Sequence, residues 1–452
     1  MAARPGSRPR TPNASLGALL EQARWSRTQL ALAVNRVGAE AGLELRYDQS
    51  AVSHWVGGTM PRAHVRPLVC EALSRRLNRP VTLREAGFAG PGCPGEGVDL
   101  AEELIDIGRQ DMDPSRRGMV QAGMYSAALA VPVFAELAGR SAAVAAGRTA
   151  RIGTGEVTGV RTMTERIAAI CDELGGGNAR PMAAAFLVNT VGPYLRASAA
   201  DDVRKKMLSA AADLVYLTGW MAMYEREHGV GQRYYVKALE LAAAAEDHVT
   251  FCRTLRGMSL QATSLGHGTL AQDLADSAAE AADASSPRLR AFLAGQQAGA
   301  TAMAGDRRRA FVRLREAERA LSRAESDAAP PSAVGGYDRC AYQFHLSSVL
   351  YETGDLPGSI DALQQSIRVQ PPGERQSRMH AHAVLAGRQF ELGHLDAACA
   401  SWQHFLDDYQ YVSTARGDGH LRTMRRRLAA WTRSAPVREL LGRARQVADL
   451  KS

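Results

Sequence analysis

A short polar segment of this 452-residue chain carries side chains suited to hydrogen-bonded recognition. On a helical wheel of about 100° per residue, one arc of "QSAVSHWV" carries only hydrogen-bonding side chains and no acid, and the opposite arc is small or apolar. The polar set is Gln49, Ser50, Ser53 and His54, and the apolar set is Ala51, Val52 and Trp55. Asp48 is a suitable N-cap and Gly57-Gly58 a firm end. The segment predicts a short helix anchored by Trp55 with its polar face open to a partner.

Plain hydration is the alternative for such a face, because many surface helices turn polar side chains to water. The surrounding arginines favour a polyanion instead. Arg62 and Arg66 follow the helix, and Arg4, Arg8 and Arg10 lie on a basic arm upstream. Guanidinium groups suit phosphate oxygens, whereas Gln, Ser and His suit base edges in a major groove.

The net charge of +8 is unevenly distributed. Residues 1–90 hold thirteen arginines and six acidic residues, and residues 411–452 hold ten basic and three acidic residues, so each range has a charge of +7. The range between them is net acidic. A basic front module favours a polyanionic partner. The basic tail is either a solvated last helix or a second contact with that partner.

Abundant Ala, Leu, Arg and Glu, with only 6% aromatic residues, favour an all-α fold. We expect a small helical head followed by an α-solenoid of helix pairs. The expected domains are a basic arm (1–12), the head (13–89), a Gly/Pro linker (90–97), a helical region leading into the array (98–204), repeats (205–410) and basic capping helices (411–452). Residues 98–452 together are called the body below.

A glycine recurs along the body where one helix is expected to give way to the next, with a small or aromatic residue five places later. These glycines are Gly229, Gly266, Gly305, Gly354 and Gly393, at steps of 37, 39, 49 and 39 residues. Glycine supplies a left-handed turn, and the second residue lets two helices pack closely. The pattern resembles tetratricopeptide repeats. The last helices should cap the array with Leu428, Trp431, Val437, Leu440 and Leu441.

Aromatic residues cluster at the start of the array. They are Tyr216, Trp220, Tyr224, Tyr234 and Tyr235. One interpretation is that they lock the first helix pair together. The other is a pocket for a small-molecule or peptide effector.

We find no catalytic, cofactor or metal-binding pattern, so an enzyme is not expected. His380 and His382 are two residues apart on an expected helix and should point away from each other. The six cysteines are scattered and are expected as reduced thiols. "GGGNAR", residues 175–180, is expected to end a helix, and Asp407-Asp408 to be solvated. With no apolar stretch long enough for a membrane and no signal sequence, we expect a soluble cytoplasmic protein.

The head resembles the helix-turn-helix of the Xre/Cro-type repressors. The match consists of Val52, Ser53, Trp55, Gly58 and Pro61, with "TQLALAV" (28–34) as the preceding helix. The resemblance implies that Gln49, Ser50 and His54 read bases and that Gln29 caps against a phosphate. Ser53, on the same polar face, is also predicted to read bases. Together with the polar face it predicts the following DNA-backbone contacts: Arg27, Thr28, Gln29, Arg46, Tyr47, Arg62, Arg66, Arg4, Arg8 and Arg10. One departure is the long connection "NRVGAEAGLELRY", which implies either a longer second helix or an inserted wing.

Taken whole, the chain resembles actinobacterial (Streptomyces-type) transcriptional regulators that join such a head to a tetratricopeptide-like body. The resemblance implies a homodimer that binds double-stranded DNA, with the body supplying dimerisation and effector sensing. The alternative is a protein-interaction scaffold whose head no longer binds DNA.

Overall fold

The computed structural model describes residues 12–40, 43–77, 79, 81–83, 85–88, 100–112, 125, 151–282, 286–325 and 336–451. Within these ranges the regular structure is helical, and the only β-type pairing is an isolated bridge between Arg151 and Ser198. The expected all-α class is therefore confirmed. None of the described helices combines the length and apolar character needed to cross a membrane. The linker at 90–97 and three predicted DNA contacts, Arg4, Arg8 and Arg10, lie outside the described residues.

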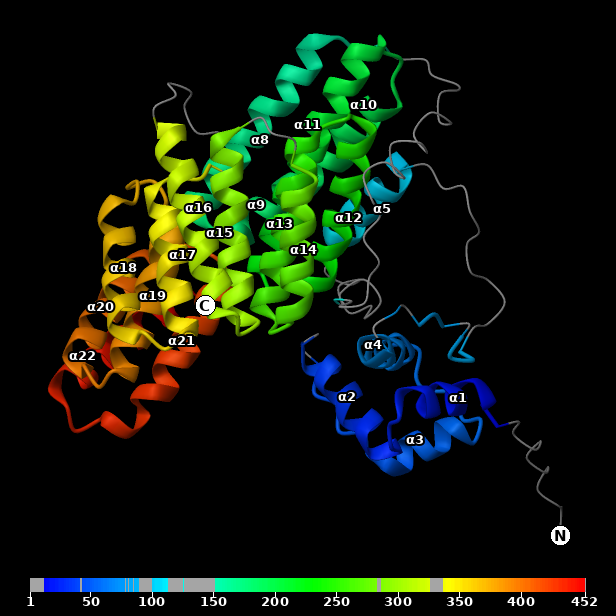
Figure 1. Cartoon of the computed structure of the whole chain (residues 1–452), viewed down its shortest axis with the longest axis horizontal. Coiled ribbons are helices and arrows are strands. Elements are labelled where there is room, and N and C mark those ends of the chain that lie inside the picture. The colour runs from blue at the N-terminus through cyan, green and yellow to red at the C-terminus, as the bar shows by residue number, and fades with distance from the viewer. Residues whose placement is uncertain are drawn as a thin grey trace. The chain divides into compact units, whose positions relative to one another are not determined.

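The chain divides into two compact units. The head belongs to the first, and the helices from α5 onward belong almost entirely to the second. The four helices of the head, blue in Figure 1, are α1 (Ala14–Ala23), α2 (Arg27–Glu40), α3 (Gln49–Val56) and α4 (Arg66–Leu77).

Side-chain caps fix where the first three helices of the head begin. The Asn13 carboxamide oxygen accepts from the Leu16 amide at 3.0 Å. At α2 the Gln29 amide donates to the Ser26 hydroxyl, while the Ser26 amide donates to Gln29 Oε1 at 2.7 Å. This reciprocal pair satisfies amides that the first turn of a helix cannot pair internally.

A single apolar core holds the head together. Leu16, Leu30, Val52, Leu68 and Leu73 are fully buried in it, one or two from each helix. The segment after α4 returns to this core and buries Phe88. Asn13 also secures this return, because its Nδ2 donates to the Ala86 carbonyl at 2.9 Å.

The long connection between α2 and α3 is partly absorbed by α2, which extends over fourteen residues. The described remainder, residues 43–48, contains no strand, so no wing is present in it. Gly38 lets the connection pass close to α2, since a Cβ there would lie 2.5 Å from Leu45 Cδ1. Asn35 then holds the backbone of Tyr47 with two hydrogen bonds of 2.8 Å, one donated and one accepted.

The body begins with α5 (Leu100–Met112), α8 (Thr154–Leu174), α9 (Gly176–Phe186), the π-helical turn η2 (Leu187–Val191) and α10 (Gly192–Arg196). Helical hairpins follow, stacked side by side from green to orange in Figure 1. They are α11 (Asp201–Tyr224) with α12 (His228–Ala244), α13 (His248–Ser264) with α14 (Gly268–Glu280), α15 (Pro287–Met303) with α16 (Arg307–Glu325), α17 (Arg339–Glu352) with α18 (Leu356–Val369), and α19 (Arg375–Glu391) with α20 (Leu395–Tyr409).

Four of the five recurring glycines lie at the turn of a hairpin. Gly266, Gly305, Gly354 and Gly393 all have φ between +79° and +91°, a backbone region that favours glycine. The prediction is wrong at Gly229, which lies inside α12. The turn before α12 is instead formed by Arg226, with φ +62°.

The end of the hairpin array meets α8 and α9, near the beginning of the body. The Ser413 amide donates to the Leu174 carbonyl at 2.8 Å, and the Gly177 amide donates to the Ser413 carbonyl at 2.9 Å. Gly175, with φ +92°, ends α8 as expected and lies so close to Ser413 that a Cβ would be 2.3 Å from its carbonyl oxygen. A side-chain bond reinforces the closure, because Gln376 Oε1 of α19 accepts from the Gly176 amide at 3.0 Å.

The last helices, α21 (Ala415–Leu428), η3 (Ala429–Trp431) and α22 (Ala435–Leu450), share a core with α19 and α20. Leu428, Val437 and Leu440 are fully buried in this core, and Leu441 packs against it, as a capping role requires. Trp431 departs from that expectation, because 49% of its surface is exposed.

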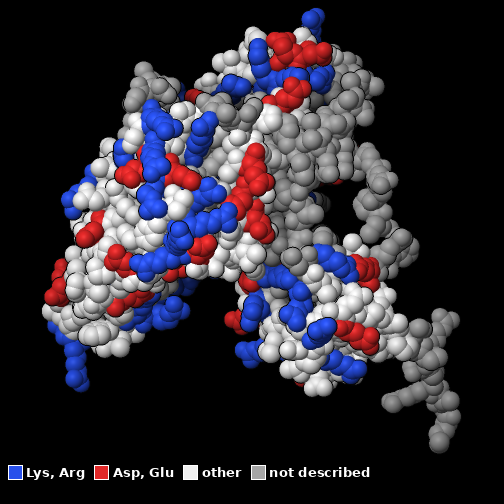
Figure 2. Space-filling view, in the orientation of Figure 1, with Lys and Arg blue, Asp and Glu red and all other residues white. Residues whose placement is uncertain are grey.

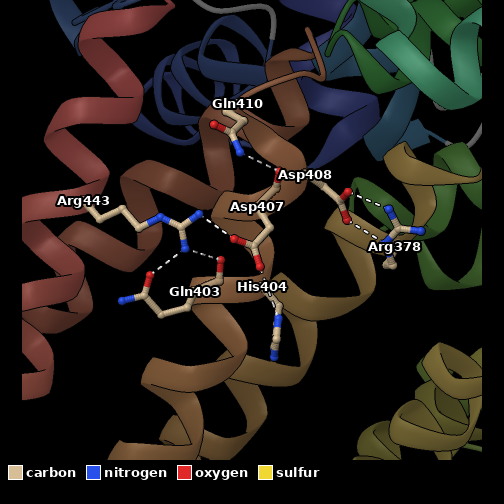
Figure 3. A network of polar contacts seen from close by, with 7 residues as sticks. All are labelled: Arg378, Gln403, His404, Asp407, Asp408, Gln410 and Arg443. Atoms are coloured by element: carbon tan, nitrogen blue, oxygen red, sulfur yellow. Dashed lines mark hydrogen bonds and ion pairs between the residues drawn. The ribbon is translucent and has the colours of Figure 1, made fainter. Parts of the chain in front are cut away.

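Figure 3 shows two adjacent aspartates of α20 reaching neighbouring helices. Asp408 accepts two hydrogen bonds from Arg378 of α19, at 2.6 and 2.8 Å, and is only 6% exposed. Asp407 pairs with Arg443 of α22. The expected solvation is wrong for Asp408, because an arginine from the adjacent helix satisfies both of its oxygens.

Candidate nucleic-acid interface

The helix α3 has two faces of opposite character. Val52 is fully buried and Trp55 is 5% exposed. Trp55 lies edge-on to Tyr47, with ring centroids 5.1 Å apart. The Asp48 carboxylate caps the helix by accepting from the Ala51 amide at 3.0 Å, and Gly58 follows its end with φ +93°. These features hold α3 rigidly on the head and leave its other face free.

The side chains of Gln49, Ser50 and His54 are exposed on that other face. Ser53 is half-buried and already bonded within the head. Its hydroxyl donates to the Gln49 carbonyl at 2.8 Å and accepts from Arg27 Nη1 at 3.1 Å. Gln49, Ser50 and His54 are therefore available to a partner, whereas Ser53 links α3 to α2.

The first residues of α2 lie beside the start of α3. Besides the Arg27–Ser53 bond, Thr28 Oγ1 lies 3.5 Å from Gln49 Oε1. Arg27, Thr28 and Gln29 are all exposed. Because Gln29 Oε1 is engaged in the cap of α2, only the amide group of Gln29 remains to donate to a phosphate. The amino end of α2 and the polar face of α3 thus form one continuous surface.

The other predicted backbone contacts differ in how free they are. Arg46 and Arg62 are exposed. Tyr47 is half-buried against Trp55, and its backbone is held by Asn35. Arg66 is half-buried, and its Nε donates to the Pro61 carbonyl at 2.9 Å, so it also fixes the turn that precedes α4.

An ion-pair network supports the head from behind this surface. Arg75 of α4 pairs with Glu40 at the end of α2 and with the buried Glu71, each at 2.7 Å. The pKa of Arg75 is raised above its ordinary value because its bonds to Glu40 and Glu71 outweigh desolvation. Sequence reasoning missed this network and the two hydrogen bonds of Asn35, because residue spacing along the chain does not indicate which polar residues meet across helices.

The comparisons with known proteins concern the head. Residues 16–89 match the family model of the SP15 N-terminal domain. The match runs from the first turn of α1 to the segment that closes the core at Phe88. A comparison with curated proteins finds no match for the chain.

The five aromatic residues proposed as a pocket do not form one cluster. Tyr234 lies apart, because its hydroxyl meets Asp111 of α5 at 3.2 Å. Tyr216 and Tyr235 are buried, with ring centroids 5.9 Å apart, and both pack at Gly257 of α13. Of these contacts, the one between Tyr216 and Tyr235 joins α11 to α12, the first hairpin of the array. Trp220 and Tyr224 remain half-buried, with ring centroids 4.9 Å apart.

The two histidines His380 and His382 do point to different neighbours. His380 Nδ1 lies 2.9 Å from His420 Nε2, whereas His382 packs against the ring of His404. No group of three metal-ligating side chains occurs in the ranges that the structure describes. The cysteines within those ranges, which exclude Cys93, are free thiols.

The body carries a basic strip along α16, although the long sequence range that contains this helix is net acidic. Helix α16 exposes Arg308, Arg315, Arg319 and Arg323, whose spacing places them along one side of the helix. Figure 2 shows basic side chains gathered over this part of the body. A cleft of about 380 Å³ lies beside the strip, lined by residues of α14, α15 and α16, including Arg319 and Arg323. None of the five predicted pocket aromatics lines this cleft.

Many cations of the basic tail are used internally. Arg425 and Lys451 donate to backbone carbonyls, and Arg443 contacts Gln403 as well as Asp407. Arg427 bridges to Glu391 and to the Gly387 carbonyl. Many of the positive charges of residues 411–452 therefore serve to pack the last helices against the rest of the body.

Proposed function

We propose that this protein is a sequence-specific DNA-binding transcriptional regulator. In this proposal the head is a helix-turn-helix of the Xre/Cro type, in which α2 and α3 form the motif and α3 enters the major groove. The observation that carries the proposal is the exposed, acid-free polar face of α3, held by the buried Trp55 and adjoining the amino end of α2.

The polar face supplies the groups that base readout requires. Gln49 offers an amide that can pair bidentately with adenine, and Ser50 and His54 offer shorter hydrogen-bonding groups along the same face. Arg27, Arg46 and Arg62 are exposed around it and would contact phosphates. The amino end of α2 adds backbone amides and a positive dipole, which favour a phosphate at that position.

The body completes the proposal as a tetratricopeptide-like array that joins two copies and senses an effector. A homodimer would place two heads on paired half-sites of one duplex. An effector that binds one arrangement of the dimer more tightly would shift the population of DNA-competent heads. The support for dimerisation is the resemblance of the head to a family that acts in pairs.

The scaffold alternative drew its support from the long connection before α3. Because α2 absorbs part of that connection and Asn35 holds its end, the connection no longer favours a head that has lost DNA binding.

The first test is selection of the full-length protein on a pool of random duplexes, followed by sequencing. We expect an enriched, palindromic motif. A protein that enriches no motif, and whose weak duplex binding does not fall steeply with added salt, would contradict the proposal.

Variants then test the assigned face on the selected duplex. Gln49→Ala and His54→Ala should each weaken specific binding by about 1–3 kcal/mol and leave non-specific binding unchanged. Arg62→Ala should weaken both alike and reduce the salt slope by about one. Gln22→Ala is the matched control, because Gln22 is an exposed amide of α1 that bonds Arg79. Equal losses for Gln22→Ala and Gln49→Ala would remove α3 from the interface.

A further inference from the structure

The first helices of successive hairpins, α11, α13, α15, α17 and α19, are called the inner helices below, and the face that they form is called the inner face. Side chains of these helices contact one another from one helix to the next. On one side, Arg256 of α13 lies over Phe292 of α15, with the guanidinium carbon 4.2 Å from the ring centroid. Phe292 lies 5.5 Å from Tyr337, and Tyr337 lies 5.5 Å from the ring of His345 on α17. The Tyr337 hydroxyl also meets His345 Nδ1 at 3.0 Å.

The contacts continue around the other side and return to the start. Phe344 of α17 lies 5.6 Å from His380 of α19, and His380 lies 5.1 Å from His420 of α21. One turn before His420 on α21, Arg416 lies over Tyr224 of α11 at 4.4 Å. Tyr224 contacts Trp220, and Trp220 lies 5.5 Å from Arg256. Six helices therefore contribute to one circuit of aromatic and cationic side chains, in which the links from His345 to Phe344 and from His420 to Arg416 run along a helix and not through a side-chain contact.

The circuit contains two arginines that no acid neutralises. Arg256 is 5% exposed, and its Nε and Nη1 have no hydrogen-bond partner. Arg416 has a ring contact but no ion pair among the described residues. An acid lies nearby, but it is engaged elsewhere: the Glu225 carboxylate accepts from the amide of Ala415, the residue before Arg416, at 2.9 Å. The neighbouring Arg253 differs, because its Nη1 contacts Asp213 at 3.2 Å.

The histidines of the circuit are half-buried among the packed helices. His345 and His420 keep part of their surface accessible. Even so, desolvation, followed by the charge of Arg256, lowers the pKa of His345 to about 3. Desolvation and the charge of Arg416 likewise lower the pKa of His420 to about 3. Both imidazoles are neutral near pH 7, so the arginines supply the positive charge of the circuit.

A buried guanidinium without a partner is unfavourable unless an anion pairs with it. Its planar fork matches an oxyanion such as a carboxylate or a phosphate, and the adjacent rings of Trp220 and Tyr224 offer apolar faces. We infer that the inner face of the body binds a small organic anion, an aromatic ring carrying a carboxylate or phosphate group. Arg256 binds the oxyanion, the adjacent pair of Trp220 and Tyr224 contacts the ring, and Arg416, over Tyr224, adds a second positive charge beside that pair.

Because this inference names the chemical class of the effector, it rests on the proposed function. The binding of the anion itself requires no DNA. The two proposals can therefore fail separately. Ligand binding without duplex binding would leave the anion site intact, and an enriched DNA motif without ligand binding would leave the DNA-binding proposal intact.

The experiment measures anion binding by the full-length protein, with thermal unfolding and titration calorimetry at constant ionic strength. The probes are benzoate and phenyl phosphate, which separate the carboxylate from the phosphate source. Benzamide serves as the neutral counterpart, and inorganic phosphate as the anion without a ring. We expect benzoate or phenyl phosphate to raise the unfolding temperature and quench tryptophan fluorescence, and the other two to do neither.

Variants locate the site. Arg256→Met and Arg416→Met should each weaken binding of the active probe by at least about tenfold. Arg307→Met is the matched control, since Arg307 also lies over a ring, that of Phe311, but on the exposed helix α16. Without a probe, Arg256→Met should unfold at the same or a higher temperature than the parent, because it removes an unpaired buried charge.

Three results would overturn the inference. The first is that neither aromatic anion binds more tightly than benzamide. The second is that Arg307→Met weakens binding as much as the two inner variants. The third is that Arg256→Met and Arg256→Lys both leave binding of the active probe unchanged. If Arg256→Met does not fold, Arg256→Lys and Arg416→Met carry the same test, because Arg256→Lys keeps the positive charge and Arg416 is only half-buried.

Discussion

The clamp between Asn35 and Tyr47 gives a quantitative prediction about the head. The Asn35 carboxamide forms two hydrogen bonds of 2.8 Å with the backbone of Tyr47, in a half-buried setting. A hydrogen bond of this kind contributes about 1 kcal/mol to stability. Asn35→Ala should therefore destabilise the connection and the start of α3 by about 2 kcal/mol, because no other described side chain holds the Tyr47 backbone.

The assay is amide hydrogen exchange of the full-length protein. A loss of about 2 kcal/mol corresponds to about thirtyfold faster exchange wherever opening of this segment controls the rate. We expect that acceleration across residues 43–58. The control is Asn178→Ala, since Asn178 is an exposed asparagine of α9 that donates only to the Leu174 carbonyl.

The reasoning would be refuted by Asn35→Ala exchange in residues 43–58 that stays within about threefold of the parent. It would also be refuted by equal acceleration in Asn178→Ala, because that would show a global loss of stability and not a local anchor.

Three further predictions concern the body. Asp408→Asn should lower the free energy of unfolding by about 2 kcal/mol, because it leaves the Arg378 guanidinium without its anion. Asp407→Asn, at an exposed carboxylate, should lower it by less than about 1 kcal/mol. Urea titration measures both, and equal effects would contradict the assignment. Gly175→Ala should lower the free energy of unfolding by about 2 kcal/mol or more, and Gly266→Ala by about 1 kcal/mol. Both glycines have positive φ, but only a Cβ at Gly175 would meet Ser413. Equal losses of stability in thermal unfolding would show that the closure contact is unimportant. Desolvation, followed by the charge of His404, lowers the pKa of His382 to about 4, so its contribution is complete above about pH 6.5 and is lost as the pH falls towards 4. The parent should therefore lose about 1 kcal/mol relative to His382→Gln between pH 7.5 and 5.5, and parallel pH profiles of stability would contradict a buried neutral imidazole.

The features of α3 that sequence could predict are local. Its cap at Asp48, its Gly57-Gly58 end and the buried Val52 and Trp55 all depend on residues within one short segment. Periodicity and capping preferences are sufficient to recognise them. The same holds for the turns at Gly266, Gly305, Gly354 and Gly393.

The features that sequence did not predict depend on residues that meet only in the folded chain. Asp408 appears solvated until Arg378 of the adjacent helix is placed against it. The isolation of Arg256 depends on the side chains that α11, α15 and α17 bring to it, none of which is an acid. At Gly229 the glycine pattern was misleading because Arg226 adopts the left-handed turn conformation itself. The basic strip of α16 escaped notice because charge was summed over a long range.

The contact of Ser413 with Leu174 and Gly177 has a consequence for how this body can vary. An open solenoid gains or loses a repeat at either end with little effect elsewhere, and its stability is nearly a sum over neighbours. Here the two ends meet, so an added or deleted hairpin would pull Ser413 away from α8 and α9. The number of hairpins is therefore fixed by closure. Opening any one of them strains the seam, so the body should unfold as a single cooperative unit and fold only after residues near 413 have been synthesised.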